Sequence, residues 1–298
     1  MVVLTGASGF LGKAIAHHLA IQQAHLLTIG RQATNHIVCD LSVEIPEIAA
    51  KNIDMVIHAA GKAHAVPKTI AQKQAFFDVN LTGTHNLLKG LENLAQLPKS
   101  FVFISSVAVY GQETGENITE QAPLNAKDPY GLSKVQAEQL VTEWCNKNNV
   151  ICTIFRLPLL AGPNPPGNLG AMIKGIQKGY YFNIAGGEAK KSMVLATDVA
   201  YAITKAWPIG GIYNLTDGQH PTFAALSNHI ASQLNKSKPV NLPFWLALVM
   251  AKIGDVVGSK SPINTIKLKK ITSNLTFDDN KARNTFDWGP SPVLDVLN

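Results

Sequence analysis

The fold is decided at the start of the chain, by the stretch VVLTGASGFLGKAIAHHL at residues 2–19. Residues 2–5 are apolar or β-branched and predict a short buried strand, and the pattern from residue 13 onward predicts a helix. Between them lie Gly6, Gly9 and Gly12, in the spacing GxxGxxG. Glycines let a backbone turn tightly and approach a pyrophosphate closely, while amides at the start of a helix hold the anion. This order of strand, loop and helix predicts a dinucleotide site rather than a structural tight turn.

Short apolar runs of the same kind recur along the chain. They lie at 25–29, 37–39, 55–59, 101–105 and 151–155, with longer helix-like segments between them. One more strand, expected at 211–215, follows a helix expected at 197–206. Short buried strands that alternate with helices are typical of a parallel sheet covered on both faces. We therefore predict an α/β fold with a Rossmann-type doubly wound parallel sheet, with ligands beyond the carboxyl ends of the strands.

A run dense in proline and glycine, PLLAGPNPPG at residues 158–167, interrupts this pattern. Such a run continues neither a helix nor a central strand, so it predicts a domain boundary. We expect residues 1–162 and 194–220 to form the Rossmann domain. A smaller, discontinuous substrate-binding domain is expected from residues 163–193 and 221–298, with helices near 223–234 and 244–257.

The composition is that of a globular protein. Of 298 residues, 46% are hydrophobic and 15% charged, which excludes a disordered chain. The longest apolar stretch, residues 242–251, is too short to cross a bilayer, and no signal peptide is recognisable, so we expect no transmembrane segment. Three dispersed cysteines form neither a disulfide framework nor a zinc motif, which favours a reducing, cytoplasmic location and no metal.

The formal net charge of +6 would suit an acidic partner such as nucleic acid, a membrane surface or a diphosphate. No basic run reaches five or six residues, and KLKK at 267–270 is the densest cluster. A mildly basic solvated surface is therefore the preferred interpretation, and we expect no nucleic-acid partner.

Two positions after the second and third strands bear on the choice of cofactor. Where an NAD enzyme usually places a carboxylate on the ribose hydroxyls, this chain has Gly30-Arg31. An arginine can neutralise a 2′-phosphate, which favours NADP(H) over NAD, although Arg31 could equally stack on adenine or be solvated. Asp40-Leu41 follow the third strand, where a carboxylate can accept from the adenine amino group. The alternative for Asp40 is an ordinary residue at the start of a helix.

Candidate catalytic residues lie in the run DPYGLSK at 128–134. Asp128 and Pro129 predict a helix start, and Tyr130 and Lys134, four residues apart, share one helical face. The phenol of Tyr130 is a poor base at a pKa of roughly 10, but a nearby ammonium and a helix start both favour the phenolate. Ser105 and Ser106 end the fifth strand at the same edge of the sheet, so a serine can hold a substrate oxygen while Tyr130 takes its proton. Either serine could instead cap the loop.

The chain combines several motifs of one known family: GASGFLG at 6–12, HAAG at 58–61, VNLTGT at 79–84, SSVAVYG at 105–111, YGLSK at 130–134 and DVA at 198–200. By these motifs it resembles the extended short-chain dehydrogenases/reductases of the NAD-dependent epimerase/dehydratase family, whose members act on nucleotide sugars. The resemblance implies Ser106, Tyr130 and Lys134 as the catalytic triad and hydride transfer at sugar C4. The expected cofactor-binding residues are Gly6, Ser8, Gly9, Phe10, Leu11, Gly12, Arg31, Asp40, Leu41, Ala59, Ala60, Gly61, Asn80, Ser105, Tyr130 and Lys134.

The same resemblance implies contacts to the substrate, for which a UDP-sugar is expected. Asn168 and Lys191 fall where relatives bind the nucleotide diphosphate, although a helix cap and a solvated lysine are equally good interpretations. His64, just beyond the fourth strand, can reach the sugar or be an ordinary loop histidine, and Ser106 is expected to touch the substrate. The segment from FDDNKAR at 277–283 to FDWGP at 286–290 matches the family's closing segment. The arginine that many relatives carry shortly before it is missing, since Ser273-Asn274 stand there.

The choice of reaction stays open at this point. Family dehydratases place an Asp-Glu pair after the serine of the fifth strand, but this chain has Val107-Ala108, which cannot move protons. A 4-epimerase and a 4-keto-reductase of polysaccharide biosynthesis both fit. Arg31 favours the reductase, whereas the overall resemblance favours epimerase-like enzymes at least as strongly. A non-catalytic NADP(H) sensor or assembly protein of the same fold is the alternative class. A third possibility is a membrane-associated role for the apolar helix expected at 244–257, although such apolar content is more often core or interface. An interface of this kind would serve a homodimer, which is compatible with the fold.

Overall fold

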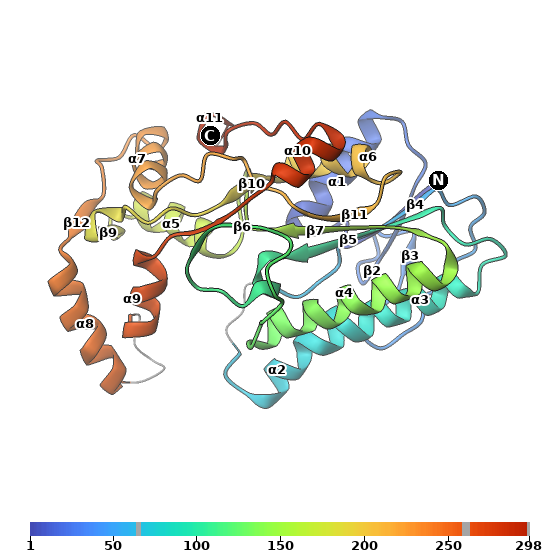
Figure 1. Ribbon diagram of the computed structural model, residues 1–298, viewed down its shortest axis with the longest axis horizontal. Coiled ribbons are helices and arrows are strands. Elements are labelled where there is room, and N and C mark those ends of the chain that lie inside the picture. The colour runs from blue at the N-terminus through green and yellow to red at the C-terminus, as the bar shows by residue number, and fades with distance from the viewer. Residues whose placement is uncertain (64–66, 258–262, 297–298) are drawn as a thin grey trace.

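A parallel sheet of seven strands forms the centre of the protein (Figure 1), in a computed structural model that describes residues 1–63, 67–257 and 263–296. The strand order is β11-β7-β5-β4-β1-β2-β3. The strands are β1 (Val2–Thr5), β2 (Leu26–Gly30), β3 (Ile37–Val38), β4 (Met55–His58), β5 (Ser100–Ser106), β7 (Ile151–Leu157) and β11 (Gly211–Asn214). The order reverses at β1, as in a doubly wound sheet, which confirms the predicted fold class.

Helices cover both faces of this sheet (Figure 1). On one face α1 (Phe10–Ile21) packs against α6 (Ala196–Ala206). On the other lie α2 (Ile70–Phe77), the π-helix η1 (Asp78–Thr82), α3 (Gly83–Glu92) and α4 (Pro129–Asn148). Each face of the sheet packs against helices in its own buried apolar cluster. The strands therefore carry apolar residues on both sides.

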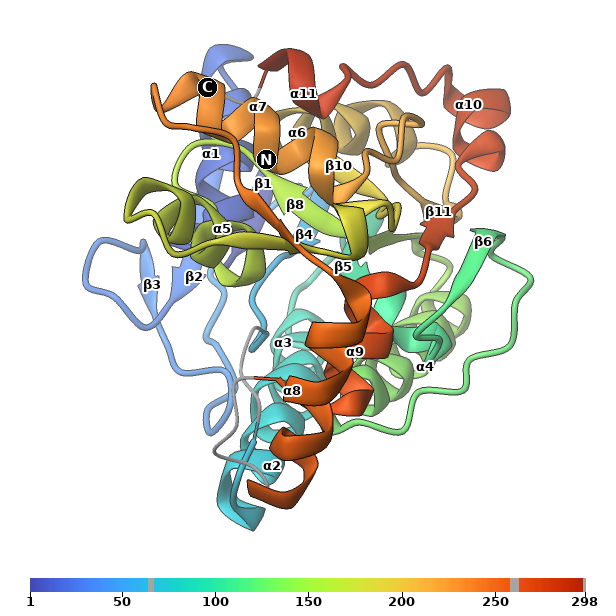
Figure 2. The same ribbon diagram turned by 90° about the vertical axis from the view of Figure 1, so that its left-hand side faces the viewer.

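A smaller lobe lies beyond the carboxyl edge of the sheet (Figure 2). It contains two short parallel pairs, β8 (Leu159–Ala161) with β10 (Met193–Leu195) and β9 (Phe182–Ile184) with β12 (Val240–Leu242). Its helices are α5 (Gly167–Gln177), α7 (Phe223–Gln233), α8 (Phe244–Val257), α9 (Thr265–Thr272) and the short α11 (Val293–Val296). Within the described residues, no helix combines the length and apolarity needed to span a membrane.

The C-terminal segment returns from this lobe to the sheet. After β13 (Leu275–Phe277) pairs with β6 (Gly115–Ile118), α10 (Asn280–Phe286) joins the core cluster of β1 and β7. The ring of Phe286 meets Tyr213 of β11 edge to face at 5.0 Å, and the indole of Trp288 donates to the carbonyl of Thr216 at 3.0 Å. The division into two domains stays a prediction, and this packing favours assigning 280–288 to the first.

Candidate active site

The glycine loop after β1 has a backbone that admits no side chains. Gly6 has φ +72°, and a Cβ there would lie 2.6 Å from the amide nitrogen of Ala60. A Cβ on Gly12 would lie 1.9 Å from the carbonyl oxygen of Gly6, so the first turn of α1 packs directly on the loop. Gly9 is the N-cap of α1, and no side chain among the described residues caps this end. The amides at the start of α1 are therefore presented to an anion, as a bound pyrophosphate requires.

Two adjoining cavities follow the carboxyl edge of the sheet from this loop. One, of about 230 Å³, lies on the β2 and β3 side; the other, of about 410 Å³, lies on the β5 and α4 side. Gly9, Ala59 and Gly61 line both, so the two cavities form one cleft across the glycine loop. The first is also lined by Gly6, Ser8, Arg31, Asp40, Leu41 and Ala60, and the second by Phe10, Leu11, Gly12, Ser105, Ser106, Tyr130 and Lys134.

The charged groups of the smaller cavity are Arg31 and Asp40. The Asp40 carboxylate accepts from the amide and hydroxyl of Ser42, at 3.1 and 2.7 Å. The hydroxyl hydrogen bond is the main cause that lowers the pKa of Asp40, and the charge of Arg31 adds a smaller share. Asp40 therefore starts a turn, not the helix that the alternative interpretation supposed. Arg31 is exposed at the cavity, where a phosphate could reach it.

The start of α4 is built to hold Tyr130 against the end of β5. Asp128 accepts from the amides of Tyr130 and Gly131, at 3.1 and 3.0 Å, and Pro129 occupies the first helical position, which confirms the predicted helix start. A Cβ on Gly131 would lie 2.7 Å from the carbonyl oxygen of Ala108. The missing side chain thus lets α4 approach the 3₁₀ turn η2 (Val107–Tyr110) that follows β5.

The phenol of Tyr130 interacts with the Ser106 hydroxyl at the head of the larger cavity. Burial raises the pKa of Tyr130, and the hydrogen bond with Ser106 opposes the rise without cancelling it. The expected shift toward the phenolate is therefore wrong for the protein by itself, because desolvation outweighs the groups that favour the anion. Ser106 also accepts from the amide of Ala108 at 3.2 Å, so it caps η2 as the alternative interpretation supposed.

Lys134 brings a buried ammonium to the same cavity. Only 5% of the residue is exposed, and its Nζ donates to the carbonyl of Ile104 at 2.8 Å. The Nζ also lies 4.4 Å from the ring centre of Phe103. Burial lowers the pKa of Lys134 to about 8, while the carboxylate of Glu138 one turn further along α4 opposes this shift. Nζ would lie 3.5 Å from a Cβ at Gly61, which places the ammonium beside the loop common to both cavities.

Ser105 lines the cavity, but its hydroxyl is used elsewhere. It donates to Glu138 at 2.5 Å, and Glu138 forms a buried ion pair with Arg156 of β7 at 2.7 Å. Arg156 further donates to the hydroxyl of Tyr110 and the carbonyl of Glu120, both at 3.2 Å. This network under the site was missed from the sequence. The sequence feature that could have indicated this network is the position of Glu138 four residues after Lys134, on the same face of the helix.

The side chains of Asn80 and His58 stabilise the loop between the two cavities through hydrogen bonds. Asn80, on the π-helix η1, accepts from the amide of Lys62 at 2.7 Å and donates to the Ser133 hydroxyl at 2.9 Å. The ring of His58 bridges Thr5 and Thr84, at 2.6 and 3.0 Å. Burial and the charge of Lys134 lower the pKa of His58 to about 3, so the ring is neutral. Asn80 lines neither cavity, and its contact to a cofactor stays a prediction.

Of the predicted substrate residues, the structure brings Ser106 to the cleft and leaves Asn168 and Lys191 outside both cavities. Asn168 is exposed in the first turn of α5, whose cap position is Pro166, so it is no helix cap. Lys191 is not a solvated lysine, because its ammonium donates to the carbonyls of Lys270 and Ser273, at 3.0 and 2.9 Å. These two hydrogen bonds connect the end of α9 to the residues just before β10. His64 lies outside the described residues.

The larger cavity has further walls that sequence patterns did not assign to the site. They are Lys62, Ala63, Ile104, Leu157, Pro158, Leu160 and Pro166. Three of these belong to the run at 158–167, which was interpreted only as a boundary. Because that run leaves the carboxyl end of β7, it lies at the ligand-binding edge of the sheet.

Comparison with known proteins adds the family. An N-acetyl-alpha-D-glucosaminyl-diphospho-ditrans,octacis-undecaprenol 4-epimerase of Escherichia coli O157:H7 is 27% identical, with 95% of this chain and 89% of that protein covered. A UDP-glucose 4-epimerase of Vibrio cholerae is 25% identical, with 98% and 92% covered. The structure of RMD from Pseudomonas aeruginosa, complexed with NADPH, superimposes with a TM-score of 0.72 over 100% of this chain and 97% of that chain, at 20% identity. The family model matches residues 2–215, and the chain therefore belongs to the NAD dependent epimerase/dehydratase family.

Proposed function

We propose that the protein is an NAD(P)-dependent 4-epimerase or 4-keto-reductase of nucleotide sugars, acting on a UDP-sugar in polysaccharide biosynthesis in the cytoplasm. One observation carries the proposal: Ser106, Tyr130 and Lys134 line a cavity that adjoins the glycine loop, whose backbone leaves no room for side chains. A binding protein without catalysis would need no such meeting of three polar groups. The two relatives reported above are both named as 4-epimerases, which also favours an enzyme over a sensor.

The glycine loop and the start of α1 would hold the pyrophosphate, and Arg31 and Asp40 the adenosine end, of a bound NAD(P). When bound, the dinucleotide supplies the hydride acceptor or donor for the sugar carbon. Tyr130 exchanges a proton with the sugar oxygen at C4, and Ser106 donates a hydrogen bond to that oxygen. Lys134 holds the ribose hydroxyls and supplies the positive charge that stabilises the phenolate as the proton leaves.

One feature favours reduction of a keto-sugar. Arg31 at the adenosine cavity suits the 2′-phosphate of NADP(H), the cofactor we propose. The raised pKa of Tyr130 does not separate the two reactions, because both reduce a keto-sugar with the protonated phenol as the proton donor. The names of the Escherichia coli and Vibrio cholerae relatives favour the epimerase.

The experiment that separates the two identifies the cofactor released from purified protein by mild denaturation and follows NADPH oxidation with a UDP-4-keto-sugar. Stoichiometric oxidation of NADPH supports the reductase. Tightly held NAD without net turnover supports the epimerase and contradicts the role of Arg31. If the protein releases no dinucleotide and oxidises no NADPH, with the fold intact, the proposed function is overturned.

A second candidate substrate is a sugar on a polyprenyl diphosphate, the substrate class that the name of the Escherichia coli relative states. The observation in its favour is the exposed apolar surface of α8 on the lobe that borders the site. Supplying the same sugar on UDP and on a polyprenyl diphosphate, at equal concentration, distinguishes the candidates by their kcat/KM.

A further inference from the structure

The helix α8 has its apolar side turned outward. The residues it buries are small, Ala247, Ala251 and Gly254, and they face α9 around Leu268. Its large apolar side chains are exposed instead, with Trp245 66% and Val256 89% accessible. Helical spacing places the outer ones on one continuous arc opposite the buried side: Trp245, Val249, Met250, Ile253, Val256 and Val257. A continuous exposed apolar face of this size on a helix of a globular protein indicates a contact surface.

The net positive charge of the protein is concentrated in the segment around this helix. Between residues 234 and 275 the sequence holds seven of the 26 lysines and arginines and one of the 20 acidic residues, Asp255. The segment thus has a formal charge of +6, equal to that of the whole chain, so the rest is neutral. Lys252 flanks the arc on α8 itself, and Lys236, Lys238 and Lys269 are exposed on neighbouring segments. The Asp255 carboxylate accepts from the amide of Thr265 at 3.1 Å.

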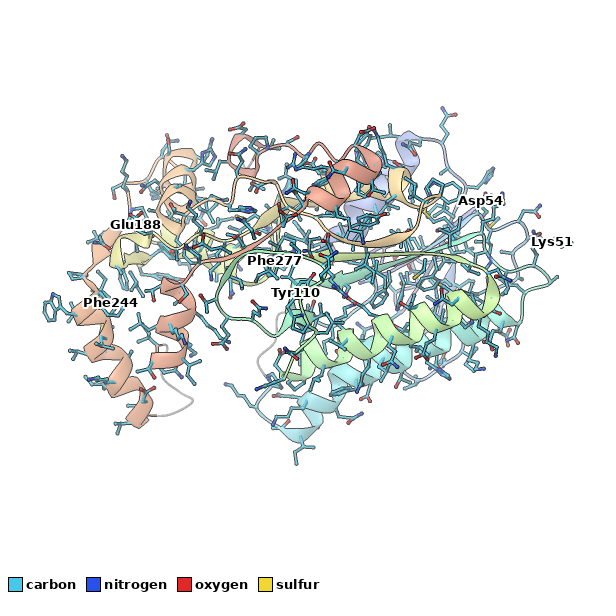
Figure 3. All side chains as sticks on the ribbon, in the orientation of Figure 1. Lys51, Asp54, Tyr110, Glu188, Phe244 and Phe277 are labelled. Atoms are coloured by element: carbon cyan, nitrogen blue, oxygen red, sulfur yellow. The ribbon has the colours of Figure 1, made fainter. Side chains whose placement is uncertain are left out.

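The position of α8 leaves this face open. In Figure 1 it forms the outer end of the lobe, away from the sheet, and in Figure 2 it crosses in front of α9. Figure 3 shows Phe244, at the start of α8, at the opposite end of the molecule from Lys51 and Asp54. At 14 residues the helix is too short to span a bilayer but long enough to lie along its surface.

An apolar face of this kind can contact a second copy of the chain or a membrane surface, and the charge of the segment favours one of the two. A second copy of the chain would bring one +6 segment against another, which repels. An anionic lipid surface attracts the lysines, while the apolar arc enters the boundary between headgroups and acyl chains. Lysine stems can lie along the apolar surface with their ammonium groups among the headgroups, and a tryptophan is favoured at that depth.

We propose that the outer face of α8, with the exposed lysines Lys236, Lys238, Lys252 and Lys269, docks the protein on an anionic membrane surface. Docking there places the smaller lobe, and the cleft beside it, next to the bilayer. The proposal is independent of which sugar or carrier the enzyme uses, because the outer face of α8 contributes nothing to either cavity.

The test is sedimentation of the full chain with vesicles of equal parts phosphatidylcholine and phosphatidylglycerol, beside vesicles of phosphatidylcholine alone. The parent should bind the anionic vesicles, and the double variant Trp245→Ser, Ile253→Ser should bind at least tenfold more weakly. The matched control is Ile21→Ser, Ile70→Ser, which removes apolar side chains of 68% and 86% exposure from α1 and α2, outside the α8 face, and should bind like the parent. Equal binding by both double variants overturns the proposal.

Two further readouts locate the contact. Lipids brominated on the acyl chain should quench the tryptophan fluorescence of the parent, because Trp245 is exposed whereas Trp144 and Trp288 are buried and Trp207 is half-buried. Replacing Lys238 or Lys269 by alanine should weaken anionic binding about fivefold each, and the exposed Lys51→Ala should not. Absence of quenching, or a dimer that the α8 variants dissociate without any vesicle binding, assigns the face to self-association and overturns membrane docking.

Discussion

The buried ammonium of Lys134 should make the stability of the protein rise with pH. Its pKa of about 8 in the folded protein lies below the 10.5 of an exposed lysine. Between these values the unfolded chain binds a proton that the folded protein has lost, so the free energy of unfolding increases with pH. At roughly 1.4 kcal/mol per pKa unit, burial costs about 3 kcal/mol at pH 7 and only about 1 kcal/mol at pH 9.5. The Lys134 ammonium should therefore raise the free energy of unfolding by about 2 kcal/mol between pH 7 and pH 9.5.

Urea denaturation at both pH values measures this gain, with Lys134→Met as the perturbation. The variant should lack the gain of about 2 kcal/mol, and at pH 7 it should be at least as stable as the parent although inactive. Lys147→Met, at an exposed lysine on the same helix, should keep the pH dependence of the parent. If Lys134→Met and the parent show the same change with pH, the ammonium is not buried in its charged form and the reasoning fails.

Four other perturbations test separate parts of the site. Tyr130→Phe should lower kcat by about 10² to 10⁴ and leave cofactor affinity unchanged; an active variant would remove the proton-transfer role. Arg31→Ala should weaken NADP binding at least tenfold and NAD binding little in direct titrations, whereas equal losses would show that Arg31 does not read the 2′-phosphate. Glu138→Ala leaves Arg156 buried without its partner and should cost about 3–5 kcal/mol in a thermal or chemical denaturation; a loss below about 1 kcal/mol would contradict the ion pair's role. Gly12→Ala, whose methyl group meets the carbonyl of Gly6, should abolish cofactor binding by calorimetry, and normal affinity would refute the close approach.

The parts of the fold that the sequence predicted depend on local chemistry. Residues 2–12 specify a buried strand, tight backbone turns and a helix start without reference to the rest of the chain. The start of α4 is equally local, since Asp128 and Pro129 satisfy the amides next to them. Because the carboxyl ends of parallel strands meet at one edge, these local motifs also placed most of the expected cofactor residues around one cleft.

The features that were missed depend on contacts between distant residues. The Ser105 hydroxyl is taken by Glu138, and the ammonium of Lys191 by carbonyls at the end of α9, 79 and 82 residues further on. The raised pKa of Tyr130 follows from how deeply its ring is buried, which no motif encodes. Spacing alone predicts which side chains can meet on a helix but not how much water the assembled site excludes.

The most direct test of the proposed chemistry follows the hydrogen at sugar C4. A UDP-hexose carrying deuterium at C4 is mixed with protein loaded with NAD⁺ or NADP⁺ in a single turnover, and the nicotinamide is analysed by mass spectrometry. Transfer by this site predicts, for the parent, deuterium on the nicotinamide after net oxidation or at C4 of the epimerised sugar after epimerisation, and neither with Tyr130→Phe. Deuterium that appears in water, or an unepimerised sugar that keeps all of its deuterium, would contradict hydride transfer at C4.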